Sequence, residues 1–417
     1  MYPMIFNKQS YLNRLIIFTF AMSTVHEVLF HLGLVGLLLY GIGSKTQHSL
    51  TRQHWLYLAI MLQFPAIMVL RKALSGAIDT PMWEGILRWC LMGYIPVLFY
   101  QKALTPSLKT LTQAAASATL IAGLVALKDI YWLNLDRAHG SEHPINYATI
   151  IALMSSLTFY GALKLEGIFR DKRKLVLIMI CFAFGGYGFI MSQARGPLLA
   201  ILITIPTIAI VYYRKFIFKP KYGFIATILT CIIIGSFYLA ADKTGLIDRT
   251  IAEIRAYENG QVIGSFGTRI EMWKSAIDIF LQKPIFGAGV NVGQLQQEGG
   301  KYIHFSPVVS HWAHVHNEAL EAMSKRGLIG LTSITLVWLL PIIIRLTNKN
   351  STLFRFCAAQ SLLFCWFLCG LTQVITSHNI GMTLLPLMFG LALIDTGIRD
   401  SRMDAGDTNE RSYEQSP

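Results

Sequence analysis

Long apolar runs are the feature that most constrains how this chain can fold. A membrane-spanning helix needs about 17–25 predominantly apolar residues, and runs of this kind recur along almost the whole chain. The first two runs are also compatible with one long tilted helix, because Glu27 and His31 interrupt the second. In total the runs predict twelve spans, which we place at Leu12–Val25, His26–Ile42, Trp55–Leu74, Trp83–Lys102, Leu108–Leu127, Ile145–Leu165, Leu175–Ser192, Pro197–Tyr213, Tyr222–Ala240, Glu318–Arg345, Leu353–Thr376 and Ile380–Ile398.

The composition supports the same class of protein. Charged residues make up 14% of the chain and apolar residues 53%, whereas about a quarter of the residues of a soluble protein are charged. We therefore expect an all-α, polytopic helical membrane protein in which residues 1–398 form a single transmembrane domain. Residues 399–417 are polar and lack apolar periodicity, which predicts a disordered cytoplasmic tail. All six cysteines fall inside apolar runs, so we expect neither a structural disulfide nor a cysteine-ligated zinc ion.

The distribution of lysine and arginine predicts the orientation of the chain. These residues accumulate in short cytoplasmic loops. If the N-terminus lies inside the cell, the basic segments 164–174 and 214–221 fall on the inner side, whereas Asp129, Asp136 and Glu142 fall on the outer side. The net charge of +13 is then mostly a sign of topology, so we expect no nucleic-acid partner. The polar segment 241–316 becomes a long loop insert outside the cytoplasm.

Segment 241–316 carries two amphipathic patterns. The stretch Leu246–Arg255 predicts a helix that lies on the membrane or on the bundle, with one apolar face formed by Ile247, Ile251 and Ile254. A second helix is predicted to begin at Thr268, because Thr268 and Glu271 have the spacing of a capping box. Pro284 and Gly287 end this second helix, and its expected apolar stripe comprises Ile270, Trp273, Ile277, Phe280 and Leu281.

Two arginines are candidates for binding an anion. Arg269 falls in the first turn of the second predicted helix, where free backbone N–H groups and the helix dipole favour negative charge; pairing with a surface acid is the alternative. Arg195 lies in a short turn between two spans, where Gly196 permits a tight turn and Pro197 suits a helix start. Its guanidinium matches a phosphate in bidentate fashion, although it can also cap the end of the preceding span.

Other charged side chains lie at the ends of the predicted spans. Arg71 and Lys72 end the third span, and Glu84 and Arg88 begin the fourth, all on the outer side. One interpretation is snorkelling to the lipid headgroups together with a Glu84–Arg88 pair at positions i and i+4. The other is a basic cluster that receives the phosphate groups of a lipid substrate.

Four histidines, His304, His311, His314 and His316, close the insert. They lack a carboxylate or cysteine at ligand spacing, so we expect no metal site. His316 is instead a candidate general base, because it precedes Asn317, a good N-cap residue at the start of the tenth predicted span. We expect this position to hold its imidazole at the membrane surface, at a depth close to that of Arg195.

Together these motifs resemble the O-antigen ligase family, which belongs to a superfamily that also contains polysaccharide polymerases. The resemblance covers roughly the second half of the chain by motif and the whole chain by topology. The motifs that carry it are Ser192-Gln-Ala-Arg-Gly196, Thr268-Arg269 with Trp273, Pro284-Ile-Phe-Gly-Ala-Gly289, His314-Val-His-Asn-Glu-Ala-Leu320 and Gly327-Leu-Ile-Gly330.

The resemblance implies an integral glycosyltransferase of the bacterial inner membrane that uses neither a metal nor another cofactor. Ligases of this family transfer a glycan, with inversion, from undecaprenyl diphosphate to a sugar hydroxyl of lipid A–core on the periplasmic side. Carried onto this sequence, the resemblance implies that Arg195 and Arg269 bind the diphosphate and that His316 is the catalytic histidine. The remaining candidate substrate-binding residues are Arg71, Lys72, Arg88, His314 and Asn317, of which the last two would orient His316.

The chemistry of these residue types agrees with that reaction. A lipid diphosphate gains negative charge as the glycosidic bond breaks, and two guanidinium groups can stabilise it. The attacking hydroxyl must lose a proton, and a neutral imidazole with a pKa of about 6.5 suits that step. A polymerase acting on two lipid-linked glycans is the alternative within the superfamily. A transporter is a weaker one, because the ionisable residues fall at the outer rim rather than at the bilayer midplane.

Overall fold

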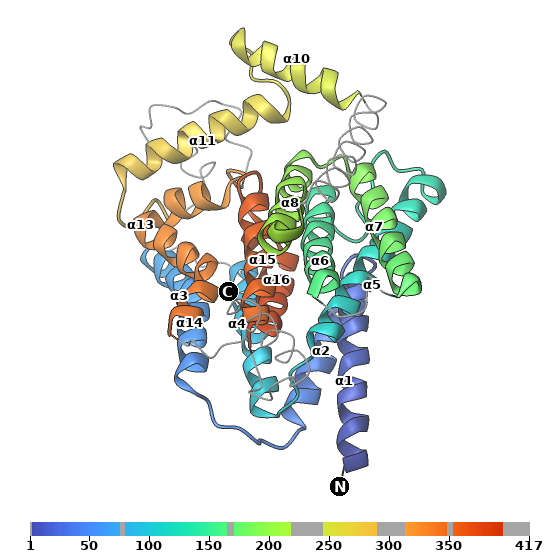
Figure 1. The fold of residues 1–417 in the computed structure, drawn as a ribbon. Coiled ribbons are helices and arrows are strands. Elements are labelled where there is room, and N and C mark those ends of the chain that lie inside the picture. The colour runs from blue at the N-terminus through green and yellow to red at the C-terminus, as the bar shows by residue number, and fades with distance from the viewer. Residues whose placement is uncertain are drawn as a thin grey trace, which may run out of the picture.

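The structure is a computed structural model of the chain, and it describes residues 2–75, 80–164, 171–217, 245–289, 313–347 and 353–394 (Figure 1). These residues form helices joined by loops and contain no strand, which confirms the all-α class. The predicted ninth span at Tyr222–Ala240, the tail at 399–417, and His304 and His311 lie outside the described residues.

The N-terminal half supplies most of the helix bundle. Its first two helices are separate and antiparallel, since the Tyr40 hydroxyl donates a 2.6 Å hydrogen bond to the carbonyl of Lys8. The alternative of one long tilted helix is therefore wrong. The helices of this half are α1 Tyr2–Met22, α2 Glu27–Ile42, α3 Arg52–Ser75, α4 Thr80–Gln101, α5 Leu108–Leu127, α6 Pro144–Lys164, α7 Lys172–Ser192 and α8 Arg195–Ile217, and the short π-helix η1 Lys128–Trp132 follows α5.

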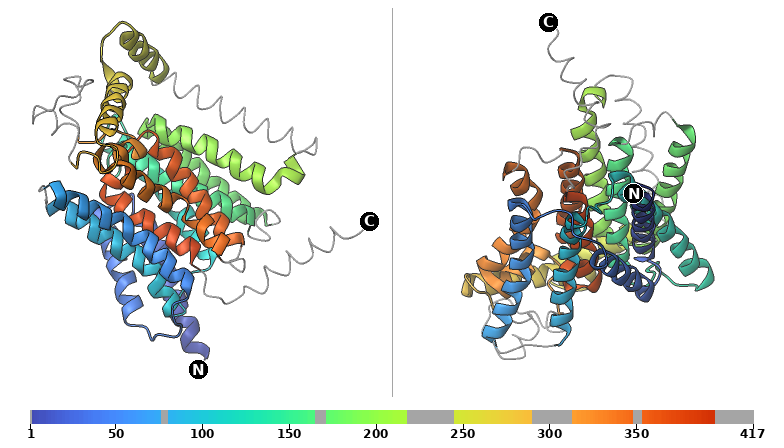
Figure 2. Two further views of the ribbon diagram at one scale, coloured as in Figure 1. Left: turned by 90° about the vertical axis from the view of Figure 1, so that its left-hand side faces the viewer. Right: turned by 90° about the horizontal axis from the view of Figure 1, so that it is seen from below.

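The C-terminal half adds further bundle helices and two helices of the insert. The insert helices α10 and α11 lie across one end of the bundle (Figure 1), and the side view in Figure 2 places them at the same end. The helices of this half are α10 Leu246–Glu258, α11 Gly264–Gln282, α13 Glu318–Trp338, α14 Leu340–Thr347, α15 Leu353–Gly370, the 3-10 helix η3 Ile375–Ser377 and α16 Asn379–Leu393.

The described helices have the length and composition of an integral membrane protein. Among the described residues, four helices can each cross a bilayer. A fifth span is counted if α13 and α14, which are bent by 62° relative to each other, are taken together. The number of twelve spans stays a prediction. The four helices that are long and apolar enough to cross a bilayer by themselves are Arg52–Leu74, Leu108–Trp132, Pro144–Lys164 and Lys172–Ser192; shorter apolar helices lie at Glu27–Ile42, Arg195–Val211, Arg355–Gly370 and Gly381–Leu393.

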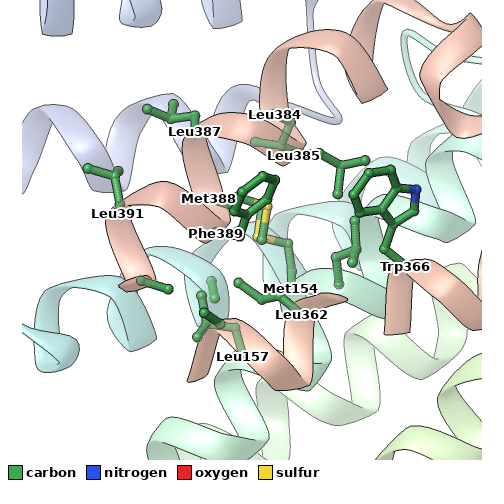
Figure 3. Close-up of a cluster of buried hydrophobic side chains, with 14 of the residues drawn as sticks. Met154, Leu157, Leu362, Trp366, Leu384, Leu385, Leu387, Met388, Phe389 and Leu391 are labelled. Carbon is green, nitrogen blue, oxygen red and sulfur yellow. The ribbon is translucent and has the colours of Figure 1, made fainter. Parts of the chain in front are cut away.

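The buried centre of the bundle lies among α6, α15 and α16. The apolar segment of α6 is 89% buried, against 28% for that of α7, so α6 is central and α7 is peripheral. Trp366 of α15 and Phe389 of α16 stack with their ring centroids 6.4 Å apart, and Met154 and Leu362 belong to the same cluster (Figure 3). This packing holds α15 and α16 together, and with them the loop 371–378 that joins the two helices.

The loops divide between the two ends of the bundle. At one end, Arg137 Nε donates to the carbonyl of Ser192 at 2.8 Å, so the α5–α6 loop meets the α7–α8 turn. At the other end, Arg355 Nη2 donates to the carbonyl of Pro106 at 2.8 Å, and Nη1 donates to that of Ile394 at 3.0 Å. Loops predicted on the outer side thus meet at one end, and segments predicted on the inner side meet at the other.

The tenth predicted span, Glu318–Arg345, is not one continuous helix. It consists of α13 and α14, which are bent by 62°. Within α13, Gly327 has φ 64° and ψ −153°, a conformation that is essentially restricted to glycine. The predicted span is therefore broken rather than continuous. Hydropathy averages over a window, so it does not register either the bend or the backbone conformation of Gly327.

A turn formed by residues 284–289 completes the hydrogen bonding of α13 at this break. The peptide N–H of Leu328 donates to the carbonyl of Pro284 at 2.7 Å, and that of Ala288 donates to the carbonyl of Ser324 at 2.8 Å. In an uninterrupted helix the Ser324 carbonyl would instead accept a hydrogen bond from the peptide N–H of Leu328. The 284–289 turn therefore takes the place of a helical turn and ties the end of α11 to the middle of α13.

Helix α11 begins earlier than the sequence predicts. It starts at Gly264, whose φ of 68° turns the chain into the helix, and the Thr268 hydroxyl donates to the Gly264 carbonyl within it. Glu271 accepts a 2.6 Å hydrogen bond from the Tyr257 hydroxyl rather than from the start of the helix. The predicted capping box is therefore wrong, and Arg269 lies in the second turn, past the free N–H groups.

The buried face of α11 also differs from the predicted stripe. Met272, Ala276 and Ile279 are buried, whereas Ile277 and Leu281 are 44% and 69% exposed. The helix carries apolar residues on two faces, so periodicity alone does not identify the face that packs on the rest of the chain.

Candidate functional site

Arg195 is the first residue of α8 and lies at the end of the bundle that carries the insert helices. The turn before it is made by Gln193, which ends α7 with a left-handed φ of 53°. Gly196 has a different role from the predicted one, because a Cβ there would collide with Thr372 of the α15–α16 loop. Close packing at Gly196 therefore brings the start of α8 against that loop. The side chain that bonds the end of α7 is Arg137 rather than Arg195.

A carboxylate of the insert faces Arg195. Glu253 of α10 places Oε2 3.5 Å from Nη1 of Arg195, and the same oxygen accepts a 3.0 Å hydrogen bond from the peptide N–H of Phe266 in the first turn of α11. Glu253 thus joins α10, α11 and α8. Glu253 was not predicted from the sequence; the available signal is an acid between Arg249 and Arg255 on one amphipathic helix.

Arg269 lies half-buried on α11 and faces the same charges. Burial lowers the pKa of Arg269 below its ordinary value, the nearby charge of Arg195 lowers it further, and that of Glu253 raises it. A guanidinium nevertheless remains protonated at neutral pH. Two guanidinium groups that share one internal counter-ion have the composition of an anion-binding site.

His316 lies in the loop that leads into α13. Its φ of 51° is in the left-handed region, which costs a residue other than glycine about 1–3 kcal/mol and is typical of functional positions. The preceding residue, Val315, is buried against Met272 of α11, and its carbonyl accepts a 3.0 Å hydrogen bond from Trp273 Nε1. Helix α11 therefore supports this loop one helical turn away from Arg269.

The α15–α16 loop contacts His316 through Gln373. The Oε1 atom of Gln373 is 2.6 Å from Nδ1 of His316, and its Nε2 atom is 2.7 Å from Nε2 of His378. Gln373 and His378 were both missed by the sequence analysis. They lie more than fifty residues from His316, and nothing in the local sequence shows that the two loops meet.

Asn317 caps α13 as predicted. Its Oδ1 accepts a 3.0 Å hydrogen bond from the peptide N–H of Leu320, and its Nδ2 donates to the carbonyl of Leu371 at 3.1 Å. The Nδ1 atom of His314 lies 3.5 Å from Oε1 of Glu321. These contacts position the backbone on both sides of His316, while its ring is held by Gln373.

Two buried carboxylates of α13 fix the loops that carry these rings. Glu318 accepts a 2.8 Å hydrogen bond from the peptide N–H of Ile375 and another hydrogen bond from the Thr376 hydroxyl. Glu321 accepts a 3.0 Å hydrogen bond from the peptide N–H of Val315. The start of α13 is therefore bonded to both loops, and these loops bring His316 and Gln373 together.

Arg195, Arg269 and His316 come together at one end of the bundle, and we call these three residues the site group. Burial lowers the pKa of His316 from 6.5; the hydrogen bond to Gln373 raises it, and the charge of Arg269 lowers it. The imidazole is therefore neutral at pH 7 and can accept a proton. Arg269 thus acts electrostatically on both Arg195 and His316.

Arg137, in the α5–α6 loop, belongs to the same cationic region and was also missed. Burial lowers the pKa of Arg137 below its ordinary value, and the charges of Arg249 and Arg195 lower it further. The signal that could have identified it is a lone arginine in an outer loop whose other charged residues include Asp136 and Glu142.

The other predicted basic residues have contacts outside the site group. Arg71 donates from Nε and Nη2 to the carbonyls of Phe286 and Gly287, at 2.6 and 2.8 Å, so it supports the 284–289 turn. Arg88 pairs with Glu84 at 3.5 Å in the i, i+4 arrangement. Contact of Arg71, Arg88 or the neighbouring Lys72 with a substrate phosphate stays a prediction.

The expected absence of a metal also stays a prediction. Among the described residues, no three or more His, Cys, Asp or Glu side chains group in a way that could hold a metal ion. His304 and His311 are not part of the region described, so this finding covers only the other histidines of the insert.

Comparison with known proteins identifies relatives of this chain. The sequence model of the O-antigen ligase family matches residues 177–335. An uncharacterized protein of Haemophilus influenzae is 27% identical over 268 residues, which is 63% of this chain and 66% of that protein. The O-antigen ligase of Escherichia coli K12 is 26% identical over 157 residues, which is 35% of this chain and 36% of that protein. The matched parts span less than two thirds of either relative's length.

The family match covers the part of the chain that contains the site group. Residues 177–335 run from α7 through the insert into α13, and they contain Arg195, Arg269 and His316. The similarity therefore includes the residues that converge in space and is not confined to apolar helices. Residues 177–335 of this chain are therefore similar in sequence to the O-antigen ligase family.

Proposed function

We propose that this protein is an O-antigen ligase that transfers a glycan from undecaprenyl diphosphate to a sugar hydroxyl of lipid A–core, on the periplasmic side of the bacterial inner membrane. The observation that carries the proposal is the convergence of Arg195, Arg269 and His316 at one end of the bundle. The similarity to the O-antigen ligase of Escherichia coli supports it. In this proposal residues 1–398 are one transmembrane domain, 241–316 its periplasmic insert, and 399–417 a cytoplasmic tail.

Arg195 and Arg269 bind the diphosphate of the donor. Glu253 is their internal counter-ion before the donor arrives, and the diphosphate takes its place. As the glycosidic bond breaks, the leaving diphosphate gains negative charge. Cations already aimed at that position lower the barrier, because they need little reorganisation at the moment of reaction.

His316 is the general base. Its neutral imidazole accepts the proton of the acceptor hydroxyl while the oxygen attacks the anomeric carbon of the donor sugar. The bond from that carbon to the diphosphate oxygen breaks on the opposite face, so the configuration inverts. Lys72 and Arg88 are candidates for holding substrate phosphates, whereas Arg71, His314 and Asn317 support the loops around the site.

Reconstitution with purified lipids tests the proposal. Proteoliposomes that contain the protein, the donor lipid and lipid A–core as the sole acceptor should form capped lipid A–core. Elongation of the lipid-linked glycan without lipid A–core would identify a polymerase instead. Arg195→Ala, Arg269→Ala and His316→Ala should each lower the rate by about 100-fold or more while the protein stays in the membrane.

Arg255→Ala is the matched control, because Arg255 is an exposed arginine near the end of α10. It removes a positive charge from the insert without touching the site group and should retain the wild-type rate. Wild-type rates in all three site-group variants would refute the assignment.

A further inference from the structure

Gln373 lies between the imidazoles of His316 and His378. It is 3% exposed, with Oε1 2.6 Å from Nδ1 of His316 and Nε2 2.7 Å from Nε2 of His378. A side-chain amide has one accepting end and one donating end. The positions of the protons on the two rings are therefore linked through Gln373.

This orientation of the amide determines which nitrogen of His316 is protonated. His316 donates its Nδ1–H to Oε1 of Gln373, and Gln373 donates an Nε2–H to the lone pair on Nε2 of His378. A neutral His316 then carries its proton on Nδ1, so its Nε2 is unprotonated. If the amide were reversed, Nδ1 of His316 would have to accept, and its Nε2 would carry the proton and could not act as a base.

We propose that Gln373 is a positioning residue that fixes His316 as the Nδ1–H tautomer, and that His378 holds Gln373 in the orientation that does so. The inference rests on the proposed role of His316 as the general base and specifies the atom, Nε2, that accepts the proton of the acceptor hydroxyl.

His378 meets the requirement for this arrangement, which is an unprotonated Nε2. Burial, with the charges of His314, His143 and His316, lowers the pKa of His378 to about 4, although the charge of Glu321 opposes this shift. His143 approaches from the start of α6, and His314 and Glu321 from the segment around the start of α13. His378 is therefore neutral at pH 7 and accepts a hydrogen bond.

The contact with Gln373 is made through Nδ1 of His316. Charged groups that act on this ring include Arg269 of α11, His314 of the preceding loop and Glu321 of α13. The loop that carries Gln373 is in turn anchored by Glu318, which accepts the peptide N–H of Ile375 at 2.8 Å. The Gln373 amide is therefore held by the two imidazoles, and the loop that carries it is held by Glu318.

Two substitutions of Gln373 separate positioning from a merely structural role. Gln373→Glu keeps an acceptor for Nδ1–H and adds a negative charge, which raises the pKa of the neighbouring imidazole. It should retain substantial activity, and the acidic limb of the pH profile of kcat/KM should move to higher pH. Gln373→Ala removes the acceptor, so kcat should fall about 100-fold, as for a misplaced catalytic group, with little change in KM.

Gln261→Glu is the control for the added charge, because Gln261 is exposed in the turn between α10 and α11. It should keep the wild-type pH profile. The inference is overturned if Gln373→Glu leaves the acidic limb unmoved, or if Gln373→Ala keeps the wild-type kcat. Loss of membrane-inserted protein in both variants, with an unchanged pH profile in what remains, would assign Gln373 a structural role and also overturn it.

A spectroscopic measurement tests the tautomer without relying on activity. Spectra of the ¹⁵N-histidine-labelled protein at pH 8 should show a protonated Nδ1 for His316, identified by the signal that His316→Asn removes. A protonated Nε2 on neutral His316 would overturn the inference. If the tautomer is as expected but lipid A–core is not capped by wild-type protein, the proposed function fails and the tautomer assignment stands.

Discussion

His316 is held in a backbone conformation that few side chains tolerate. At φ 51°, Asn is accepted more readily than most residues, whereas a β-branched residue is a genuine outlier. His316→Asn should therefore keep the thermal stability of the protein while its transfer rate falls about 100-fold or more, because the base is lost. His316→Val should have both a lower transfer rate and a lower melting temperature.

Melting temperatures in detergent and transfer rates with purified lipids measure the two effects for the His316 variants. Equal melting temperatures for the Asn and Val variants would show that the left-handed backbone is not retained. Substantial transfer by either variant would show that another residue acts as the base.

The ionisation of His316 sets the expected lower pH limit of activity. Burial, the largest effect, lowers the pKa of His316 below 6.5, so the imidazole stays neutral at pH values where an exposed histidine is half protonated. The value of kcat/KM should be constant near pH 7 and decrease on acidification, with a midpoint below pH 6.5. A midpoint above 6.5 would mean that a nearby negative charge outweighs burial.

The site residues differ in how far the sequence could predict them. Arg195 stands in a short turn and His316 in a loop, so local sequence identifies them as candidates. Arg269 was also named, although the capping box that pointed to it is wrong and it lies within α11. Glu253 and Gln373 are ordinary polar residues in sequence. Their roles arise only when α10 reaches α8 and the α15–α16 loop reaches α13, and these contacts between distant segments leave no local pattern.

Gly327 is the residue on which the shape of α13 depends. Its backbone conformation is essentially restricted to glycine, and a Cβ there would collide with the carbonyl of Ile285 in the 284–289 turn. Gly327→Ala should cost about 1–3 kcal/mol of stability and lower the melting temperature and the transfer rate together, because the turn is displaced.

Gly186→Ala is the matched control for Gly327→Ala. Gly186 is an exposed glycine of α7, and a Cβ built there meets no atom within 4 Å. This variant should be as stable as the wild type or more so, since alanine favours a helix. A melting temperature of Gly327→Ala equal to that of Gly186→Ala would contradict the conformation of α13 described above.

The elements were predicted with uneven success for physical reasons. The bounds predicted for α5, Leu108–Leu127, match the structure, because Ser107 caps the start of the helix and the apolar run ends at Lys128 and Asp129. The start of α11 was predicted four residues too late at Thr268, since Thr268 and Glu271 imitate a cap while Glu253, from another helix, supplies the bond to the first turn.

The two ends of the bundle should face opposite sides of the membrane. Asn259, after α10, and Gln47, between α2 and α3, are both exposed and belong to loops predicted on the outer and inner sides. Asn259→Cys should react with a membrane-impermeant thiol reagent in spheroplasts. Gln47→Cys should react only after the membrane is permeabilised.

The wild-type protein is the control for the labelling, because its cysteines lie in apolar runs. Labelling of both introduced cysteines from the same side would contradict the predicted topology. Reversed labelling would place the site group in the cytoplasm and remove the proposed donor and acceptor from reach.

The overall class was predictable from the sequence, because apolar runs and the alternation of basic loops report directly on a bilayer. The arrangement of the helices was not. Packing of Trp366 against Phe389 and the backbone conformation of Gly327 within α13 depend on complementary side-chain shapes and on a single glycine, and hydropathy measures neither.

The exchange of hydrogen bonds between the 284–289 turn and α13 limits how the insert can open. The far end of α11 cannot swing outward without exposing unpaired peptide groups of α13 at the edge of a bilayer, where each is costly. Movement that admits a bulky polymer is therefore expected at the opposite end, where α10 is held to α8 by the Arg195–Glu253 pair at 3.5 Å. Helices α10 and α11 would then pivot about the 284–289 turn when the arriving anion competes for Arg195.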